Sequence, residues 1–231
     1  MGREVKEYDE RMQEILATAR GLFFTKGYDA TSINDIISAI GIAKGTFYHY
    51  FDSKQDLLLG VADQLTDEGL ARVQPDLTDA SLAPIEKFNQ FFLDSGSWKA
   101  ENREQMVELM RIISRDENIM LVQKMDEQSI EKVTPLLTQV INEGIEEGVF
   151  DTEFPRESAE IILAMGVHLS AAVRSILLEG HLDAASLESA RVKTRAYERA
   201  VERVLGAPAH SMTLIDTTMY EKFADVIEKD D

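Results

Sequence analysis

The chain has 231 residues, no cysteine and a formal net charge of −18, so it is long enough for one large or two small domains, and disulfides and thiol chemistry are excluded. Its first ten residues are charged and contain no apolar run, so they do not resemble a signal peptide, and we expect a soluble cytoplasmic protein. Residues 1–55 carry seven Lys and Arg against eight Asp and Glu. The acidic remainder of the chain either serves solubility or orients the near-neutral end toward a polyanion.

The first predicted helix has one apolar face and ends near Gly27. That face carries Met12, Ile15, Leu16, Ala19, Leu22 and Phe23. Its helical spacing predicts that this helix covers the two helices that follow it.

Residues 31–54 predict two short helices joined by a tight turn. Ser32 and Asp35 have capping-box spacing. Isoleucines then occupy positions 33, 36, 37 and 40, on one face of a helix. Gly41 allows the chain to turn with positive φ, and a second helix is expected over residues 42–50. Two helices in this arrangement form a helix-turn-helix.

The second of these helices presents small and polar side chains outward. They are Lys44, Gly45, Thr46, Tyr48 and His49. Lys44 can donate to the O6 and N7 atoms of guanine, and Thr46 can offer a methyl group to thymine or a hydroxyl to phosphate. Tyr48 and His49 can contact phosphate or a base, although His49 is also compatible with a plain exposed polar residue. The sequence therefore predicts insertion into a DNA groove.

Helices fill most of the remaining sequence. A connecting helix is expected over about residues 54–73, ending before Pro75, and Pro84 suits the first turn of the next one. Residues 94–99 form a broken patch around Gly96 and Trp98. The later helices are expected at residues 106–113, 118–147, 155–180 and 183–205.

The helix that starts at Pro155 is apolar almost all round, so it must be covered on every side. Its longest apolar run, residues 158–178, is interrupted by Glu160 and Arg174. No uncharged run reaches the ~18 residues of a membrane span, so we expect no membrane association.

A further helix is predicted near the C-terminus. Met219, Tyr220, Phe223, Val226 and Ile227 have helical spacing within residues 207–231. This segment is either a helix docked on the core or a disordered acidic tail.

The N-terminal sequence closely resembles the DNA-binding domain of tetracycline-repressor-type (TetR/AcrR) transcriptional regulators. The matching residues are Ala19, Leu22, Phe23, Gly27, Tyr28, Thr31, Ile36, Gly41, Gly45, Thr46, Tyr48, Tyr50, Phe51, Lys54 and Leu57. Two positions depart from the family pattern: Ala43 replaces the usual Ser or Thr that caps the recognition helix, and Ile37 replaces the usual Ala. Loss of the cap costs about 1 kcal/mol and removes a phosphate contact.

The resemblance implies an all-α fold with a helix-turn-helix domain at residues 1–54 and a helical ligand-binding and dimerisation domain at residues 55–206. It also implies a homodimer in which the helices at about residues 155–180 and 183–205 pair with their copies. Phosphate contacts are implied for Thr31 or Ser32 and for Lys54, each near a helix N-terminus. A two-fold dimer implies double-stranded DNA with a palindromic operator as its partner.

In such regulators the C-terminal domain also encloses a small-molecule pocket. The candidate lining residues are Phe88, Phe92, Trp98, Met106, Met110, Met125, Met165, His168 and Arg174, and this set predicts a largely apolar effector. Taken singly, each apolar member is better interpreted as plain core. His168 and Arg174 interrupt an apolar helix, so they contact the ligand, pair within the core or pair across the dimer.

The predicted function is a sequence-specific transcriptional repressor that a ligand releases from DNA. The alternatives are an activator of the same type and a helical interaction module that has lost DNA binding. We expect no enzymatic activity, cofactor or metal, because glycine-rich phosphate loops, nucleophile elbows and His-based metal motifs are absent from the sequence.

Overall fold

The computed structural model describes the backbone of residues 2–179 and 183–230, and the side chains of residues 8–75, 77–178 and 183–228. Over these residues the fold is helical and contains no strand, which confirms the all-α prediction. The helices are α1 (Gly2–Thr25), α2 (Ile33–Ile40), α3 (Lys44–Tyr48), α4 (Lys54–Thr78), α5 (Pro84–Glu101), α6 (Arg103–Ile113), α7 (Ile119–Glu146), α8 (Pro155–Glu179), α9 (Ala184–Leu205) and α10 (Met219–Asp230), with a 3-10 turn at Asp116–Asn118.

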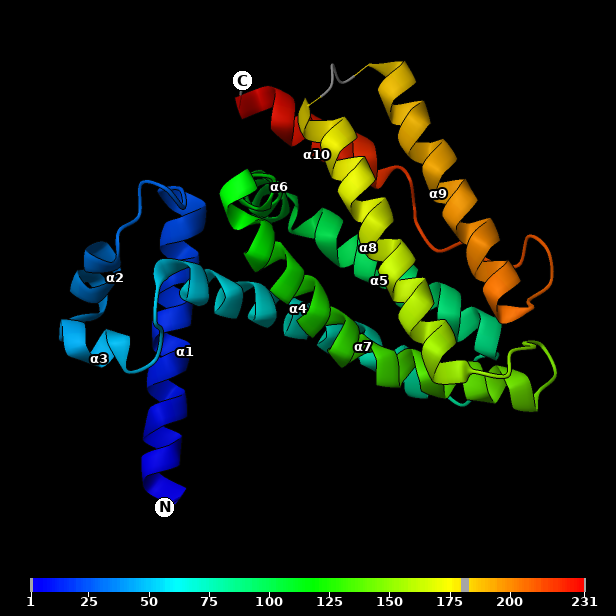
Figure 1. Cartoon of the computed structure of the whole chain (residues 1–231), viewed down its shortest axis with the longest axis horizontal. Coiled ribbons are helices and arrows are strands. Elements are labelled where there is room, and N and C mark those ends of the chain that lie inside the picture. Colours follow the sequence, from blue (N-terminus) through cyan, green and yellow to red (C-terminus); the bar gives the residue numbers. More distant parts are fainter. Residues whose placement is uncertain (1, 180–182, 231) are drawn as a thin grey trace.

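The helices form two units (Figure 1). The N-terminal unit, α1 to α3, lies at one end of the molecule, and α4 leads from it into the larger C-terminal unit. Helices α8 and α9 pack side by side on the part of the C-terminal unit that lies far from α3. The elements predicted to read DNA and those predicted to dimerise are therefore at opposite ends.

The N-terminal unit has its own core. Ile15, Phe23, Ile36 and Phe47 are fully buried there and bring α1, α2 and α3 together. At about 25 cal/mol per Å² of apolar surface, each such side chain contributes roughly 2 kcal/mol to folding. The predicted covering role of α1 follows from this packing.

Two helices are longer than the sequence predicted. Helix α4 continues through Pro75 to Thr78, although proline removes a helical hydrogen bond. Val73 and Leu77, on either side of Pro75, are buried in the core, and their packing offsets the loss. The prediction that α4 ends near residue 73 is therefore wrong.

The predicted broken patch at residues 94–99 is wrong for a similar reason. Helix α5 runs without a break from Pro84 to Glu101. Gly96 costs about 1 kcal/mol within a helix, but Phe91 and Ala100 on the same helix are buried. A Cβ atom at Gly96 would lie 3.7 Å from the Met219 sulfur, so the glycine faces α10 at close range.

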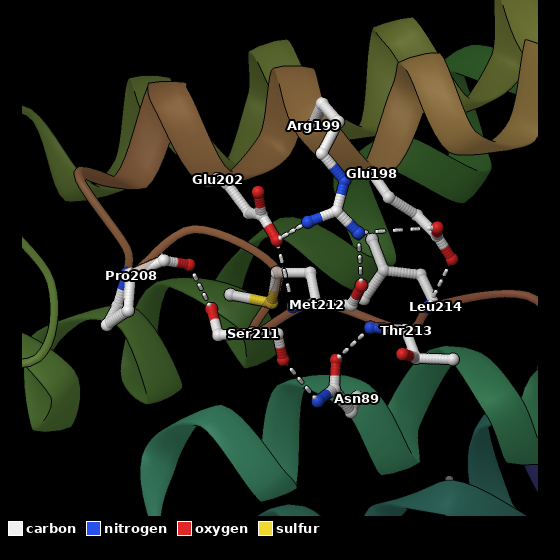
Figure 2. A network of polar contacts seen from close by, with 9 residues as sticks. All are labelled: Asn89, Glu198, Arg199, Glu202, Pro208, Ser211, Met212, Thr213 and Leu214. Atoms are coloured by element: carbon white, nitrogen blue, oxygen red, sulfur yellow. Dashed lines mark hydrogen bonds and ion pairs between the residues drawn. The ribbon is translucent and has the colours of Figure 1, made fainter.

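Residues 207–218 form a strap between α9 and α10 (Figure 1), and Figure 2 shows where this strap passes between α9 and α5. Two buried carboxylates of α9 hold its backbone: Glu202 accepts the Met212 N–H at 3.1 Å, and Glu198 accepts the Leu214 N–H at 2.9 Å. Arg199 donates to the Met212 carbonyl at 3.1 Å.

Helix α5 holds the other side of the strap. Asn89 donates to the Ser211 carbonyl and accepts the Thr213 N–H, both at 3.0 Å. Met212 and Leu214 are fully buried. The segment beyond α9 is thus docked on the core, and it ends in α10.

The strap makes folding stability sensitive to acid. Burial raises the pKa of Glu202, but N–H donors of Met212 and His210 and the charge of Arg199 outweigh it, so the pKa lies below 4.5. A lowered carboxyl pKa adds stability above about pH 4.5, and this stability is lost as the pH falls further. Glu202→Gln should therefore cost about 1–2 kcal/mol at pH 7, with the difference from wild type shrinking below pH 4.5.

Urea unfolding at pH 7 and at pH 3.5 to 4.5 measures this effect. The control is Glu131→Gln, because Glu131 is exposed on α7. A difference between wild type and Glu202→Gln that stays constant with pH would contradict the assigned role of the Glu202 carboxylate.

Candidate nucleic-acid interface

The turn between α2 and α3 is built by local hydrogen bonds. Ser32 caps α2, its hydroxyl accepts the Asp35 N–H, and the Asp35 carboxylate accepts the Ser32 N–H at 2.7 Å. Hydrogen bonds from Ser32 and an ion pair with Lys26 at 2.9 Å keep the pKa of Asp35 far below its ordinary value. Gly41 closes α2 with a φ of 79°, a conformation that glycine adopts without strain. The predicted capping box and turn are therefore present.

Helix α3 is one short helix with a single buried anchor. It spans five residues, fewer than predicted, and its N-cap Ala43 makes no side-chain hydrogen bond. Phe47 is fully buried against the core of the N-terminal unit. Because Phe47 fixes one face of α3, the opposite face is turned to solvent.

The solvent face of α3 carries the predicted contact residues. Lys44, Gly45 and His49 are exposed, Thr46 is half-buried, and Tyr48 is 44% exposed. The Lys44 ammonium lies 5.8 Å from the centre of the Tyr48 ring, so a positive charge and an aromatic hydroxyl are presented together.

A residue that the sequence did not single out joins this face. Tyr8 of α1 stacks on Tyr50 with ring centres 4.6 Å apart and meets the His49 ring edge-on at 5.8 Å. The apolar pattern began at Met12, so it contained no signal for Tyr8. The structure adds Tyr8 because α1 extends beyond the other two helices of its unit.

Thr31 is not a surface residue. Its side chain is fully buried, and its hydroxyl donates to the Gly27 carbonyl at 2.8 Å. The prediction that Thr31 contacts phosphate is wrong, because the hydroxyl instead joins the end of α1 to the start of α2. Ser32 is exposed and is the member of this pair that solvent reaches.

Lys54 is directed inward. Its ammonium donates to the carbonyls of Tyr28 at 2.7 Å and Thr31 at 3.0 Å, and it lies 4.0 Å from the Tyr28 ring centre. Desolvation lowers the pKa of Lys54, and it raises the pKa of Tyr28 to about 12. Two of the three ammonium N–H groups are occupied, so one at most remains for a phosphate.

Two residues from helices of the C-terminal unit are buried in the core of the N-terminal unit. Ile112 at the end of α6 and Leu121 at the start of α7 are buried in the cluster that contains Leu57 and Val61 of α4. Polar contacts reinforce this junction: Arg115 pairs with Asp29, and Gln55 donates to Asn118 at 3.2 Å. A shift of α6 or α7 therefore changes the packing beneath α2 and α3.

The predicted effector residues are distributed over several surroundings. Phe88 and Met106 are buried core, whereas Phe92, Trp98, Met110 and Met165 pack partly buried against the same core. Met125 packs against the core of the N-terminal unit, and His168 is exposed on α8. These nine residues were predicted as one lining because of their side-chain chemistry, but in the fold they do not line a single pocket.

Two surface hollows of about 270 Å³ each are present. One lies among α5, α6 and α10, and it is lined by Gly96, Ser97, Ala100, Glu101, Arg103, Asp216, Met219 and Lys222. The other lies between the start of α7 and α8, and Arg174 is the one predicted effector residue that lines it. Within the described residues, no three His, Asp or Glu side chains are grouped as metal ligands.

The N-terminal unit packs three helices together, and the last of them, α3, turns a polar face to solvent. This arrangement of α2, the turn and α3 defines a helix-turn-helix protein. Comparison with known families agrees: residues 15–61 match the model for bacterial regulatory proteins of the tetR family, and residues 99–171 match that for the tetracyclin repressor-like C-terminal domain.

Individual relatives support the same assignment. The HTH-type transcriptional repressor KstR2 of Mycobacterium tuberculosis is 28% identical over 154 residues, which cover 65% of this chain and 74% of that protein. A TetR-family regulator from Pectobacterium atrosepticum shares the fold, with a TM-score of 0.62 at 22% identity over 88% of this chain and 98% of that one. A TetR regulator from Haloarcula marismortui has a TM-score of 0.58 at 25% identity over 83% and 98%.

The chain belongs to the TetR family of transcriptional regulators. Membership implies DNA binding, dimerisation and control by a small-molecule effector. By length and composition α8 could also cross a membrane, alone among the helices in the described ranges, but regulators of this family are soluble DNA-binding proteins.

Proposed function

We propose that this protein is a cytoplasmic homodimeric repressor that binds a palindromic operator and is released from it by a small-molecule effector. The observation that carries the proposal is α3, where Phe47 is buried and Lys44, Tyr48 and His49 are exposed on the other face. The similarity to a transcriptional repressor supports the direction of control.

Each subunit would place α3 in the major groove. Lys44 would donate to guanine, and Tyr48, His49 and Thr46 would contact phosphates or base edges. Ser32 would replace Thr31 as the phosphate ligand at the start of α2, because its hydroxyl is accessible. Such a short helix offers few base contacts, so two copies are needed for a specific site.

The dimer would form through α8 and α9. Ile161 of α8 is 51% exposed and Val192 of α9 is 50% exposed in the single chain, and α8 is rich in apolar residues. Exposed apolar faces of this kind are removed from water when a second copy packs on them as a four-helix bundle. Burial in such a dimer interface would account for the apolar composition of α8 without insertion into a membrane.

The effector would act through the junction between the two units. Ile112 and Leu121 belong to the core beneath α2, so a ligand that shifts α6 or α7 changes the separation of the two α3 helices in the dimer. A ligand that prefers the misfitting separation weakens DNA binding, and DNA weakens ligand binding to the same extent.

Tyr48→Ala should weaken operator binding by more than about 1 kcal/mol, because the ring and hydroxyl are removed from the DNA-facing side of α3. The Kd for operator DNA is measured by fluorescence anisotropy at fixed salt, and the dimer mass by light scattering. Phe154→Ala removes a more exposed aromatic ring, 62% exposed, outside the N-terminal unit and serves as control. If the folded Tyr48→Ala variant binds the operator as tightly as wild type, the DNA-contacting face lies elsewhere than on the exposed side of α3.

Selection of bound sequences from a random DNA duplex pool tests the proposal as a whole. Enrichment of one palindrome at near-physiological salt is the expected result. No enrichment from folded dimer would favour a helical interaction module. A palindrome whose occupancy raises transcription in a reporter would identify an activator instead.

A further inference from the structure

His49 is the one residue of the α3 contact face whose side chain is held between aromatic rings. It follows α3 as the C-cap, where its N–H donates to the Thr46 carbonyl at 3.2 Å and fixes the backbone. Its side chain is exposed, and within the described residues its imidazole makes no hydrogen bond. Both ring nitrogens are therefore available to DNA, and only neighbouring side chains restrict how the ring points.

Two tyrosine rings form a corner around His49. The Tyr50 ring lies 5.4 Å from the His49 ring at an interplanar angle of 80°, and the Tyr8 ring lies 5.8 Å from it at 87°. The two tyrosine rings stack on each other with centres 4.6 Å apart and 30° between their planes. Edge-to-face and stacked contacts at these separations are favourable, so the three rings stabilise one another in this arrangement.

Tyr8 reaches this corner because it continues the buried stripe of α1. Met12 and Ile15 lie four and seven residues further along that helix, on the same face, and pack in the core of the N-terminal unit. Tyr8 itself is 39% exposed, since α1 extends past α3 (Figure 1). Tyr50 is half-buried against the same core. The stack is therefore anchored from α1 and from the residues that follow α3.

Holding His49 in place before DNA arrives lowers the cost of binding. A side chain that moves freely in the unbound protein loses rotamer entropy when it is immobilised at an interface. His49 loses part of this freedom on folding, because two rings already restrict it, so less remains to be lost at the operator. Tyr8 contributes this restriction from α1, outside the helix-turn-helix itself.

We propose that Tyr8 is a positioning residue for DNA binding: its ring holds the His49 imidazole toward the DNA, and its effect on operator affinity passes through His49. The inference rests on the proposed function, because it assigns a role at the DNA-facing side of α3. The ring of Tyr8 is required and its hydroxyl is not, since ring contacts alone join Tyr8 to Tyr50 and His49 among the described residues.

A double-mutant cycle on the selected palindrome tests this role. His49→Ala should raise the operator Kd at least about fivefold, and Tyr8→Ala about three- to tenfold. The double variant should bind within about twofold of His49→Ala, because Tyr8 has nothing left to position. Effects that multiply in the double variant, or an unchanged Kd in either single variant, would overturn the proposal.

Tyr8→Phe separates positioning from direct contact. It keeps the ring and removes the hydroxyl, so its operator Kd should lie within about twofold of wild type. If Tyr8→Phe weakens binding as much as Tyr8→Ala, the hydroxyl contacts DNA directly and the positioning role is wrong. Phe154→Ala removes an exposed ring outside the N-terminal unit and should bind as wild type does.

The ring contact can also be measured without DNA. The chain has four histidines, so His49→Ala identifies the imidazole signal of His49 in a ¹H–¹³C NMR spectrum of histidine-labelled protein. That signal should move in Tyr8→Ala, because the ring current of Tyr8 is lost, and should stay in place in Tyr8→Phe. An unmoved signal in Tyr8→Ala would contradict the contact on which the inference depends.

The outcomes of these experiments keep the two proposals apart. A folded wild type that selects no palindrome contradicts the proposed function. A normal palindrome, bound with independent contributions from Tyr8 and His49, contradicts this inference alone.

Discussion

Ile161→Asp is expected to convert the dimer to monomers and to weaken operator binding at least a hundredfold. Ile161 is 51% exposed on α8, in the face proposed to pack on a second copy. A two-fold axis brings the substitution into the interface twice, and each buried, unpaired carboxylate costs roughly 2 kcal/mol or more. Operator affinity falls with the dimer, because a monomer binds a single half-site.

Sedimentation equilibrium and operator titration measure the two effects. The matched control is Met120→Asp, because Met120 is 66% exposed at the start of α7, outside α8 and α9. A dimeric Ile161→Asp variant would place the interface on another surface. If Ile161→Asp is monomeric but binds the palindrome as tightly as wild type, operator affinity does not depend on dimerisation.

Gly144→Ala is expected to destabilise the fold by about 2–3 kcal/mol, although alanine favours a helix over glycine. A Cβ atom at Gly144 would lie 2.1 Å from the Phe150 ring. Phe150 is 3% exposed and packs edge-on against Phe88 at 6.1 Å, so its ring cannot move aside without disturbing the core. The close approach lets the chain reverse after α7 and bring α8 back along it.

Thermal unfolding checks this prediction, with an expected decrease in Tm of roughly 5–10 °C. Gly21→Ala is the control: it makes the same change within α1, where nothing lies within 4 Å of the added Cβ. It should raise stability slightly, by about 0.5–1 kcal/mol. Equal effects of the two substitutions would mean that the Phe150 contact carries no energetic weight.

The contrast between these two glycines shows where sequence reasoning stops. Residues 144–150 contain glycine where a long helix closes, and the sequence supports a turn there. Nothing in the sequence distinguishes a glycine required by a neighbouring ring from one that has free space around it. That distinction depends on Phe150, which the fold brings back onto α7.

The recognition face illustrates what local patterns can decide. The isoleucine period, the Ser32–Asp35 spacing and Gly41 act within a few residues, so α2, the turn and the exposed side of α3 could be predicted. The predicted phosphate contact of Thr31 is wrong, because its burial depends on the hydrogen bond to the Gly27 carbonyl and on the packing of α1 on α2. A phosphate contact is predicted for Lys54, whereas its ammonium donates to the carbonyls of Tyr28 and Thr31 in the structure.

The sequence by itself determined the all-helical class and the residues on the outer face of α3, because helical periodicity, capping and turn chemistry are local. The family was indicated by the resemblance of the N-terminal residues to TetR-type regulators. The tertiary structure alone decided the continuity of α4 and α5 and the docking of the strap by Glu198 and Glu202. Each of these depends on contacts between residues far apart in the chain. Burial against such partners can outweigh the cost of a proline or a glycine within a helix, and no local pattern records it.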